Sequence, residues 1–297
     1  MLEKIIIFGS RRGQVAAALA DILHDDAVIF SRSDADLDFS DYGSVVSKLS
    51  GYKPKFIVNA AAYTDVNKAE SEEADAYLAN ATFPASLAIY CKERDIPLVH
   101  YSSDYVLSGE GNHPHKETEE ATPLNAYGRT KLAGEHEIEK IGGKYLIFRT
   151  SWVYNHYSRN FFTTMLNLAK DREELSVVAD QIGAPTYAPH LSHAIIQIME
   201  KSLKMEKFPS GLYHLCNSGE TSWHDYAEEI FALARKKGVE LKVKNVIPIS
   251  TDKFPSPAKR PLNSRLDCSK VKEIFGVEMP DWKVGLEECL EQKIESN

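Results

Sequence analysis

The first regular segment of the chain is Lys4-Ile5-Ile6-Ile7-Phe8-Gly9-Ser10-Arg11-Arg12-Gly13-Gln14-Val15-Ala16. A short apolar run leads into a turn with two glycines, and helical spacing follows over Gln14–Leu23. A continuous apolar strand joined to a helix is typical of parallel sheets, whose strands are buried on both faces. A glycine turn at that junction lets the backbone approach a ligand and points the amide groups of the helix N-terminus toward it. The segment therefore predicts an α/β fold that begins with an anion-binding turn.

The same alternation continues through the first half of the chain. Strand-like runs are expected at Lys4–Phe8, Ala27–Phe30, Phe56–Asn59, Leu98–Tyr101 and Tyr145–Arg149. Helical spacing separates them at Gln14–Leu23, Ala74–Glu93 and Ala126–Ile141. Because connections between parallel strands are right-handed crossovers, this order predicts a doubly wound, Rossmann-type parallel sheet.

The pattern becomes less regular after Trp152. Helices are expected at Phe161–Lys170, Leu191–Lys201, Ser222–Lys237 and Asp281–Gln292, and a strand at Leu175–Val178. The proline-rich connection Pro248–Pro261 is too polar for a core and too long for a tight turn. We expect residues 1–152 to form the sheet domain and residues 153–297 to form mainly a smaller C-terminal lobe, with segments that return to the sheet.

Composition excludes several classes of protein. The 297 residues carry a formal net charge of −8, which argues against a nucleic-acid binder, because such proteins neutralise phosphates with basic residues. No apolar run approaches the roughly 20 residues needed to span a bilayer, and the N-terminal stretch lacks a signal-peptide pattern. The four cysteines are scattered without a CxxC pair, so we expect reduced thiols packed as small hydrophobes and a cytoplasmic protein. They are Cys91, Cys216, Cys268 and Cys289.

The residues around the glycine turn indicate a dinucleotide cofactor. A strand, a glycine turn and a helix form a pyrophosphate site, although glycines also follow strands in many folds that bind nothing. NAD-selective sites usually carry a carboxylate after the second strand, whereas this chain has Ser31-Arg32-Ser33 there and Arg11 and Arg12 in the turn. Guanidinium groups suit a 2′-phosphate, so we expect NADPH, with NADH as the alternative. Solvated surface arginines are the competing interpretation.

Other cofactor contacts are expected along the sheet edge. Asp38 and Phe39 are placed to border the adenine, and small residues follow the third strand where a cofactor can lie. The complete predicted set, which makes residues 1–152 a dinucleotide-binding domain, is Gly9, Ser10, Arg11, Arg12, Gly13, Gln14, Val15, Arg32, Asp38, Phe39, Ala60, Ala61, Ala62, Tyr63, Asn80, Tyr127 and Lys131.

Tyr127 and Lys131 form the candidate catalytic pair. They are four residues apart at the start of a predicted helix, and therefore lie on one helical face. A cation near a phenol favours the phenolate, so we expect the pKa of Tyr127 to fall. Ser102 and Ser103 end the fourth strand, where open α/β sheets bind ligands, and one of them can orient a carbonyl while Tyr127 supplies a proton. Alternatively, both serines only satisfy turn amides.

Several segments together resemble a known family. The glycine turn, Ser102-Ser103-Asp104-Tyr105-Val106 and Tyr127-Gly128-Arg129-Thr130-Lys131 are similar to extended short-chain dehydrogenases/reductases. Within that superfamily the chain resembles the dTDP-4-dehydrorhamnose reductase family nearly end to end. The segments that carry this closer likeness include Arg149-Thr150-Ser151-Trp152-Val153-Tyr154, Asp180-Gln181-Ile182-Gly183-Ala184-Pro185-Thr186 and Arg260-Pro261-Leu262-Asn263-Ser264-Arg265-Leu266.

The resemblance implies an NADPH-dependent reduction. Hydride would pass from C4 of the nicotinamide to the C4 ketone of dTDP-6-deoxy-L-lyxo-4-hexulose, giving dTDP-L-rhamnose in a monomer or homodimer. Tyr127 would protonate the alkoxide, Lys131 would hold the nicotinamide ribose and lower the tyrosine pKa, and Ser103 would orient the ketone. The substrate contacts that it implies are Ser103, Asp104, Tyr105, Trp152, Asn160, Arg260 and Arg265.

The chain departs from the family pattern in its glycine loop, and other functions compete with the one that the resemblance implies. The glycine loop has one residue more than the family pattern and ends in Ala16. We predict no metal, because the first helix begins without a carboxylate, and because His113 and His115 lack ligand partners at suitable spacing and are expected on the surface. The competing functions are a non-catalytic subunit like the regulatory β-subunit of methionine adenosyltransferase, a reductase of another nucleotide-activated 6-deoxy-4-keto sugar, and an epimerase or dehydratase.

Overall fold

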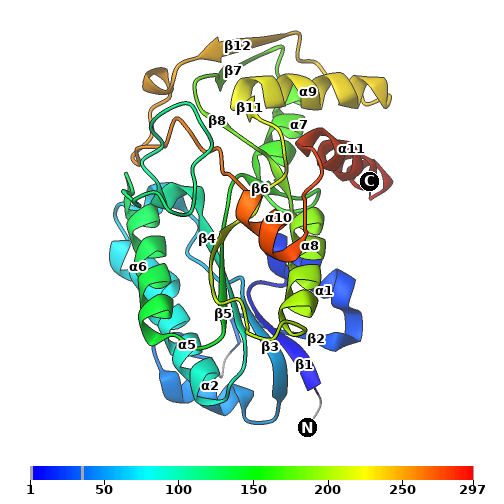
Figure 1. Ribbon diagram of the computed structural model, residues 1–297. Coiled ribbons are helices and arrows are strands. Elements are labelled where there is room, and N and C mark those ends of the chain that lie inside the picture. The colour runs from blue at the N-terminus through cyan, green and yellow to red at the C-terminus, as the bar shows by residue number, and fades with distance from the viewer. Residues whose placement is uncertain (1–2, 35–36, 297) are drawn as a thin grey trace.

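The computed structural model describes residues 3–34 and 37–296 (Figure 1). Its central sheet has six strands in the order β10-β5-β4-β3-β1-β2, and every neighbouring pair is parallel. The strands are β1 (Glu3–Phe8), β2 (Ala27–Phe30), β3 (Lys53–Asn59), β4 (Leu98–Ser103), β5 (Tyr145–Thr150) and β10 (Gly211–His214). The predicted doubly wound α/β sheet is confirmed.

Helices cover both faces of this sheet. Figure 1 shows α2, α5 and α6 on one side and α1 and α8 on the other. Their bounds are α1 (Gln14–Leu23), α2 (Tyr42–Leu49), α5 (Phe83–Glu93), α6 (Ala126–Ile141) and α8 (Ala188–Ser202). The strand order changes direction between β1 and β3, and such a switch point opens a crevice at the carboxyl ends of the strands, where ligands bind in this architecture.

Alternating side chains of β1 divide the interior into two cores. Ile7 is fully buried on the side of α1 and α8, whereas Ile6 and Phe8 are fully buried on the side of α2 and α5. Burial on both faces is what a central parallel strand requires, and it explains why the strand is uninterruptedly apolar. The first core also includes Tyr213 from β10, so the second half of the chain helps to build it.

The remaining elements form a lobe above the carboxyl edge of the sheet (Figure 1). Its largest buried side chains include Tyr154, Phe162 and Tyr226, which form a separate core with Trp282. The elements are β6 (Val153–Tyr154), α7 (Phe161–Asp171), β7 (Glu174–Val178), β8 (Ile182–Gly183), β9 (Thr186–Tyr187), β11 (Thr221–Ser222), α9 (Trp223–Lys236), β12 (Asn245–Ile249) and α11 (Trp282–Glu295). The helix α10 (Ser269–Phe275) instead packs on β10 and α8 and adds Val271 and Phe275 to the first core.

Several details differ from the sequence-based expectation, and the helices α2 and α10 were not expected. The helix predicted at Ala74–Glu93 consists of α4 (Glu73–Tyr77), a π-helix at Leu78–Thr82 and α5, and it is preceded by the short α3 (Val66–Ala69). Strand β10 was not expected, although it pairs with β5 and extends the sheet. The first two residues of the predicted connection Pro248–Pro261 belong to β12, which pairs with β7.

Candidate active site

A cavity of about 600 Å³ lies at the carboxyl edge of the sheet. Residues that follow β1, β2 and β3 line it together with the ends of β4 and β5 and the first turns of α6. The sequence-predicted residues that line this cavity are Gly9, Ser10, Arg12, Gly13, Gln14, Val15, Arg32, Phe39, Ala60, Ala61, Ala62, Ser103, Asp104, Tyr127, Lys131 and Trp152. Lining residues that were not predicted include Ala79, Tyr101, Thr150, Ser158 and Arg159.

The glycine turn forms one wall of the cavity. A Cβ atom on Gly9 would lie 2.7 Å from the Cβ of Ala16, so the close packing of the turn on α1 requires a glycine at this position. Gly13 is the N-cap of α1, and no side chain of the described residues caps it. The first backbone amides of α1 are therefore left for a ligand, and the N-terminal end of a helix favours an anion.

Two of the three predicted arginines reach the cavity. Arg12 and Arg32 line it and are exposed, whereas the Nη2 of Arg11 donates a hydrogen bond to the carbonyl of Ile29 at 3.3 Å. Asp38 is also turned into its own loop, where its Oδ1 accepts hydrogen bonds from the amide and hydroxyl of Ser40. These bonds hold the pKa of Asp38 below its usual value. Of the predicted arginines, Arg12 and Arg32 are thus placed to meet a phosphate, and the exposed Arg159 lines the same cavity.

Tyr127 lies in the first turn of α6, whose start is fixed by several contacts. Asn125 caps the helix by accepting a hydrogen bond from the amide of Gly128 at 2.8 Å, and Glu70 accepts one from the amide of Ala126 at 2.6 Å. A Cβ atom on Gly128 would lie 2.1 Å from the carbonyl oxygen of Tyr105, so only glycine allows this approach. The glycine after the tyrosine therefore sets how deeply the phenol enters the cavity.

The expected fall in the pKa of Tyr127 is wrong for the structure as described. Burial raises the pKa of Tyr127, and a hydrogen bond with Ser103 opposes that rise without cancelling it. Lys131 does not offset the burial, because its Nζ donates a hydrogen bond to the carbonyl of Tyr101 at 2.5 Å and lies 3.4 Å from the Nε2 of His100. Tyr127 consequently keeps its proton in this arrangement.

Lys131 is a buried cation, with only 2% of its surface exposed. Burial lowers its pKa to about 8, while the charge of Glu135, one helical turn further on, acts in the opposite direction. His100 is also fully buried, and its Nδ1 lies 3.0 Å from the Nδ2 of Asn59. Burial and the charge of Lys131 lower the pKa of His100, so the histidine stays neutral beside the ammonium group.

The two serines of β4 have different partners. The hydroxyl of Ser103 donates to Asp104 Oδ1 at 2.9 Å and accepts a hydrogen bond from the amide of Tyr105 at 3.1 Å, so it satisfies a turn amide and faces the cavity as well. Ser102 donates to Glu135. Burial raises the pKa of Asp104 to about 6, against hydrogen bonds that lower it.

A buried ion pair that the sequence did not reveal lies behind Ser102. The guanidinium of Arg149 in β5 donates two hydrogen bonds to Glu135 in α6, at 2.9 Å and 2.6 Å. Both side chains are less than one-twentieth exposed. The pair joins α6 to the sheet one helical turn beyond Lys131, so it helps to fix the face of the helix that carries Tyr127 and Lys131.

Trp152 forms a wall between the cavity and the lobe. Its φ of 49° lies in the left-handed region, where a tryptophan is unusual. The ring stacks on Trp223, with ring centroids 3.6 Å apart and planes inclined by 14°. A Cβ atom on Gly183 would approach the Trp152 ring to 2.8 Å, so the ring is held from both sides. Trp223 was not predicted, because its contact with Trp152 joins segments far apart in the chain.

Several predicted site residues lie outside the cavity. The side-chain amide of Asn80 is buried and bonds to the backbone of Tyr63 and to Thr130, while the hydroxyl of Tyr63 bonds to Glu72. Asn160 is the N-cap of α7 and donates to the carbonyl oxygens of Asn155 and Ser158. Their amide and hydroxyl groups therefore already have protein partners.

The other predicted residues outside the cavity are Tyr105, Arg260 and Arg265. The ring of Tyr105 meets that of Tyr127 edge-on, with centroids 5.7 Å apart, and its hydroxyl lies 3.4 Å from Arg260 Nη1. Tyr105 thus lies between Arg260 and Tyr127, the candidate acid. Arg265 instead pairs with Glu220 and lines a second cavity.

The expectation for the histidines at 113 and 115 is half correct. His113 is exposed, but His115 is only 3% exposed, and its Nδ1 lies 2.6 Å from Glu119 Oε2. A parallel bridge between His115 and Leu266 brings the histidine inside, which local spacing does not reveal. Among the described residues, one set of potential metal ligands lies close together, namely His224, Asp225 and Glu228, and none of them lines the cavity.

Three buried polar atoms of cavity-lining residues have no hydrogen-bond partner among the described residues. They are the hydroxyls of Tyr101 and Thr150 and the Oδ2 of Asp104. A buried polar atom without a partner is costly, so such atoms mark places where a ligand completes the hydrogen bonding. Together with the uncapped start of α1 and the exposed cations Arg12 and Arg32, they fit a phosphorylated dinucleotide. No helix among the described residues is long and apolar enough to cross a membrane.

The chain is similar to known proteins over nearly its whole length. The family model described as the RmlD substrate binding domain matches residues 3–294. The dTDP-4-dehydrorhamnose reductase of Escherichia coli (strain K12) is 43% identical over 97% of this chain and 97% of its own length. The solved structure of dTDP-4-dehydrorhamnose reductase from Bacillus anthracis in complex with NADP has a TM-score of 0.89 at 35% identity, covering 98% of this chain and 100% of that one. The Clostridium acetobutylicum orthologue has a TM-score of 0.88 at 34% identity, over 97% and 99% of the two chains.

Proposed function

The chain belongs to the dTDP-4-dehydrorhamnose reductase family, and on that basis we propose that it reduces the C4 ketone of dTDP-6-deoxy-L-lyxo-4-hexulose to give dTDP-L-rhamnose. The family membership and the class of NAD(P)H-dependent oxidoreductase predicted from the sequence are confirmed. The identity of the sugar, the proton donor and the roles of individual residues are the content of the proposal.

NADPH is the cofactor that the cavity fits. The Bacillus anthracis relative is described in complex with NADP, and the cavity of this chain has the features that such a ligand needs. The amides at the start of α1 would hold the pyrophosphate, and Arg12 and Arg32 would hold the 2′-phosphate through charge-assisted hydrogen bonds. When bound, the nicotinamide supplies the hydride. Residues 1–152 would then provide mainly the cofactor site and residues 153–297 mainly the sugar-nucleotide site.

Tyr127 would act as the proton donor. Since burial keeps the phenol protonated, the residue enters the reaction in the state that a reduction needs. Ser103 is hydrogen-bonded to Tyr127 and faces the same cavity, so its hydroxyl is placed to orient the ketone oxygen toward the phenol. After the proton has left, the charge of Lys131 would stabilise the phenolate, and Ser103 would add a hydrogen bond only by turning its hydroxyl from Asp104 to Tyr127.

One observation carries the proposal. The glycine turn after β1, Ser103 at the end of β4 and the pair Tyr127 and Lys131 on α6 line one cavity, although more than one hundred residues separate the first from the last. A non-catalytic binding protein would not need this acid beside the hydroxyl. The intact site therefore favours the reductase over the regulatory-subunit alternative.

The test is an assay of NADPH oxidation with dTDP-4-keto-6-deoxyglucose, with and without a 3,5-epimerase. We expect oxidation only when the epimerase supplies the L-lyxo sugar. Tyr127→Phe should lower the rate by roughly 100-fold or more, which is the usual contribution of a general acid, and should leave NADPH binding nearly unchanged. Tyr77→Phe is the matched control, because Tyr77 is 47% exposed and does not line the cavity.

Each possible result has a clear meaning. No oxidation despite tight NADPH binding would reject this substrate and favour another nucleotide-activated 6-deoxy-4-keto sugar or the non-catalytic alternative. A Tyr127→Phe variant that turns over at the wild-type rate would reject the proposed acid. Equal rates with NADH and NADPH would contradict the proposal that Arg12 and Arg32 bind the 2′-phosphate, because NADH lacks this group.

A further inference from the structure

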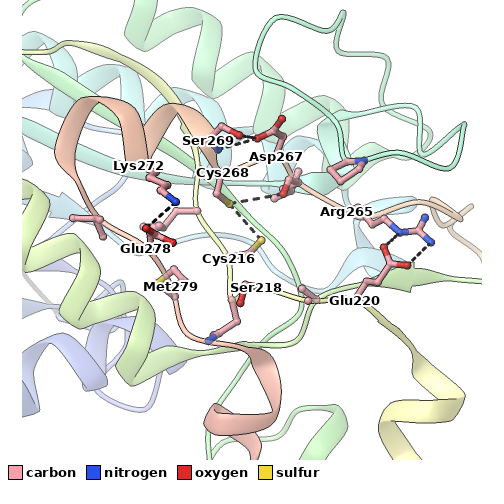
Figure 2. A pocket seen from close by; sticks show the side chains of 17 residues that line it. Cys216, Ser218, Glu220, Arg265, Asp267, Cys268, Ser269, Lys272, Glu278 and Met279 are labelled. Carbon is pink, nitrogen blue, oxygen red and sulfur yellow. Dashed lines mark hydrogen bonds and ion pairs between the residues drawn. The ribbon is translucent and has the colours of Figure 1, made fainter.

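A second cavity, of about 540 Å³, contains two thiols that the reductase chemistry does not use (Figure 2). It lies between the segment that follows β10 and the segment that leads into α10. Its wall includes Cys216, Arg265, Cys268 and Met279. None of its lining residues lines the candidate active-site cavity.

The two thiols face each other within the wall of this cavity. The Sγ atoms of Cys216 and Cys268 lie 3.7 Å apart, although 52 residues separate the cysteines in the chain. Figure 2 shows both side chains pointing toward one another from neighbouring segments. A disulfide needs an S–S distance of about 2.05 Å, so the sulfurs must approach by roughly 1.7 Å to form one.

The two members of the pair differ in access. Cys216 is only 5% exposed, whereas Cys268 is half-buried and opens on the cavity. Its hydrogen bond with Cys268 and its burial raise the pKa of Cys216, so Cys216 holds its proton more firmly than a free thiol. Access and protonation therefore give an order of reaction, with Cys268 meeting an external reagent first and Cys216 acting second.

The other two cysteines have no such arrangement. Cys91 and Cys289 are buried in two different cores, with 2% and 0% of their surfaces exposed. Neither lines the cavity that Cys268 faces. They provide an internal comparison for any reagent that reacts with thiols.

We propose that Cys216 and Cys268 form a reversible disulfide by exchange with a low-molecular-weight disulfide. The thiolate of Cys268 attacks one sulfur of the reagent RSSR, which releases RS⁻ and leaves a mixed disulfide on Cys268. Cys216 then loses its proton and attacks the Sγ of Cys268, which releases the second RS⁻. Two protein thiols are oxidised and one reagent disulfide is reduced to two thiols, so the exchange balances.

The bond would link two segments that lie 52 residues apart in the chain. Cys216 follows β10 of the central sheet, and Cys268 ends a segment that is hydrogen-bonded to His115 and Ile182 through its backbone. Closing this long loop restricts the unfolded chain, so the oxidised protein should unfold at a higher temperature than the reduced protein. The proposal does not depend on the proposed function, since the thiols lie outside the active-site cavity.

The experiment uses the full chain and oxidised glutathione. After incubation, free thiols are blocked with iodoacetamide under denaturing conditions, and tryptic peptides are analysed by mass spectrometry. We expect the peptides containing Cys216 and Cys268 to be linked and two hydrogens lighter than the sum of their free forms, while Cys91 and Cys289 remain free. A reductant should restore four free thiols and the lower unfolding temperature.

Variants test the order of the two steps. Cys216→Ala should stop at a stable glutathione adduct on Cys268, and Cys268→Ser should leave all remaining thiols unmodified. Cys91→Ala, a change at an equally buried cysteine, should still form the linked peptides. Four free thiols in the oxidised wild-type protein would overturn the proposal, as would a stable adduct on Cys268 without a link or a disulfide that involves Cys91 or Cys289. The mapping of the wild-type protein needs no variant, so poor folding of Cys216→Ala would not affect it.

Discussion

Lys131 shows how burial and function oppose one another in a single residue. Its charged group is almost completely enclosed, and the carbonyl of Tyr101 is the main partner that compensates for lost water. Burial lowers its pKa to about 8, from the ordinary lysine value of 10.5. Such a residue costs stability, and its retention is explained by the ribose contact that we propose for it.

This cost gives a prediction for the pH dependence of stability. The folded chain binds the proton of Lys131 less tightly than the unfolded chain, so the penalty is complete below about pH 8 and disappears as the pH rises toward the unfolded pKa. The wild-type protein without cofactor should therefore gain stability relative to Lys131→Met, on the order of 2 kcal/mol, between about pH 7 and about pH 10. Urea denaturation of both proteins at the two pH values measures this difference.

The same variant has a functional readout. Lys131→Met should lose most NADPH oxidation at every pH, because the methionine cannot bind the ribose hydroxyls. An identical pH dependence of stability in both proteins would mean that the amine is not desolvated as described. Lys140→Met serves as the control, since Lys140 lies on the same helix with a side chain that is 76% exposed.

For single residues, the sequence was sufficient to select candidate site residues but not to predict their burial or hydrogen-bond partners. The spacing of Tyr127 and Lys131 is sufficient to place them on one face of a helix. The direction of the Tyr127 pKa could not be predicted, because the outcome depends on burial and on the hydrogen bond that holds Lys131 at Tyr101. Trp223 and His100 were missed for a related reason, since their contacts join elements that are distant in the chain.

Among the elements, the π-helix at Leu78–Thr82 packs very closely against a neighbouring helix. It lies against α6, and a Cβ atom on Gly134 of α6 would come within 2.1 Å of the carbonyl oxygen of Asn80. A carbonyl of the backbone cannot move aside as a flexible side chain can. The close approach lets Asn80 reach Thr130, one residue before Lys131, with a hydrogen bond of 3.0 Å.

Gly134→Ala should therefore be destabilising although alanine is the better helix former. The added methyl group forces α6 away from the π-helix, and overpacking of this kind costs about 1–3 kcal/mol, which exceeds the intrinsic gain of up to about 1 kcal/mol from replacing glycine. Because α6 carries Tyr127 and Lys131, NADPH oxidation should fall as well. Denaturant midpoints and initial rates give the two measurements.

Gly51→Ala is the matched control for this substitution. A Cβ atom on Gly51 meets no other atom within 4 Å, so the change should affect neither stability nor rate beyond a few tenths of a kcal/mol. Equal stabilities of Gly134→Ala and the wild-type protein would show that the two helices can separate freely, and the geometric account of their packing would then be wrong.

Long periodic elements were predicted well and short ones were not. The bounds of α1 and α6 agree with the expected helices, because each has an amphipathic pattern and a clear start. Strand β10 has only four residues, two of them half-buried, so its pattern is too short to stand out. The π-helix was read as a continuous helix, since a local change of hydrogen bonding leaves the apolar spacing almost intact.

For the whole molecule, one of the three cores does not follow the division of the chain at residue 152. The buried residues of the core around Phe8 all precede it and those of the lobe core all follow it, whereas the core on the α1 side draws on both halves. The core on the α1 side combines Leu19 and Val99 from the first half with Ile195, Ile198 and Tyr213 from the second. Strand β10 also completes the sheet beside β5. The sequence indicated that later segments return to the sheet, but only the structure shows that α8 covers one of its faces (Figure 1).

This arrangement predicts that residues 1–152 do not fold alone. Without α8 and β10, the fragment would leave the apolar faces of α1 and β5 exposed to water, and each large side chain left unburied forfeits about 1.5–3 kcal/mol. Since a domain is stable by only about 5–15 kcal/mol, a few such losses are sufficient to prevent folding. We expect the isolated fragment to lack a cooperative thermal transition and to fail to bind NADPH, while the full chain unfolds in a single transition. Co-expression with residues 153–297 should restore both properties, because it returns α8 and β10 to the sheet. A fragment that melts cooperatively and binds NADPH would instead establish that the cofactor half folds independently, and that the later segments only cover a finished sheet.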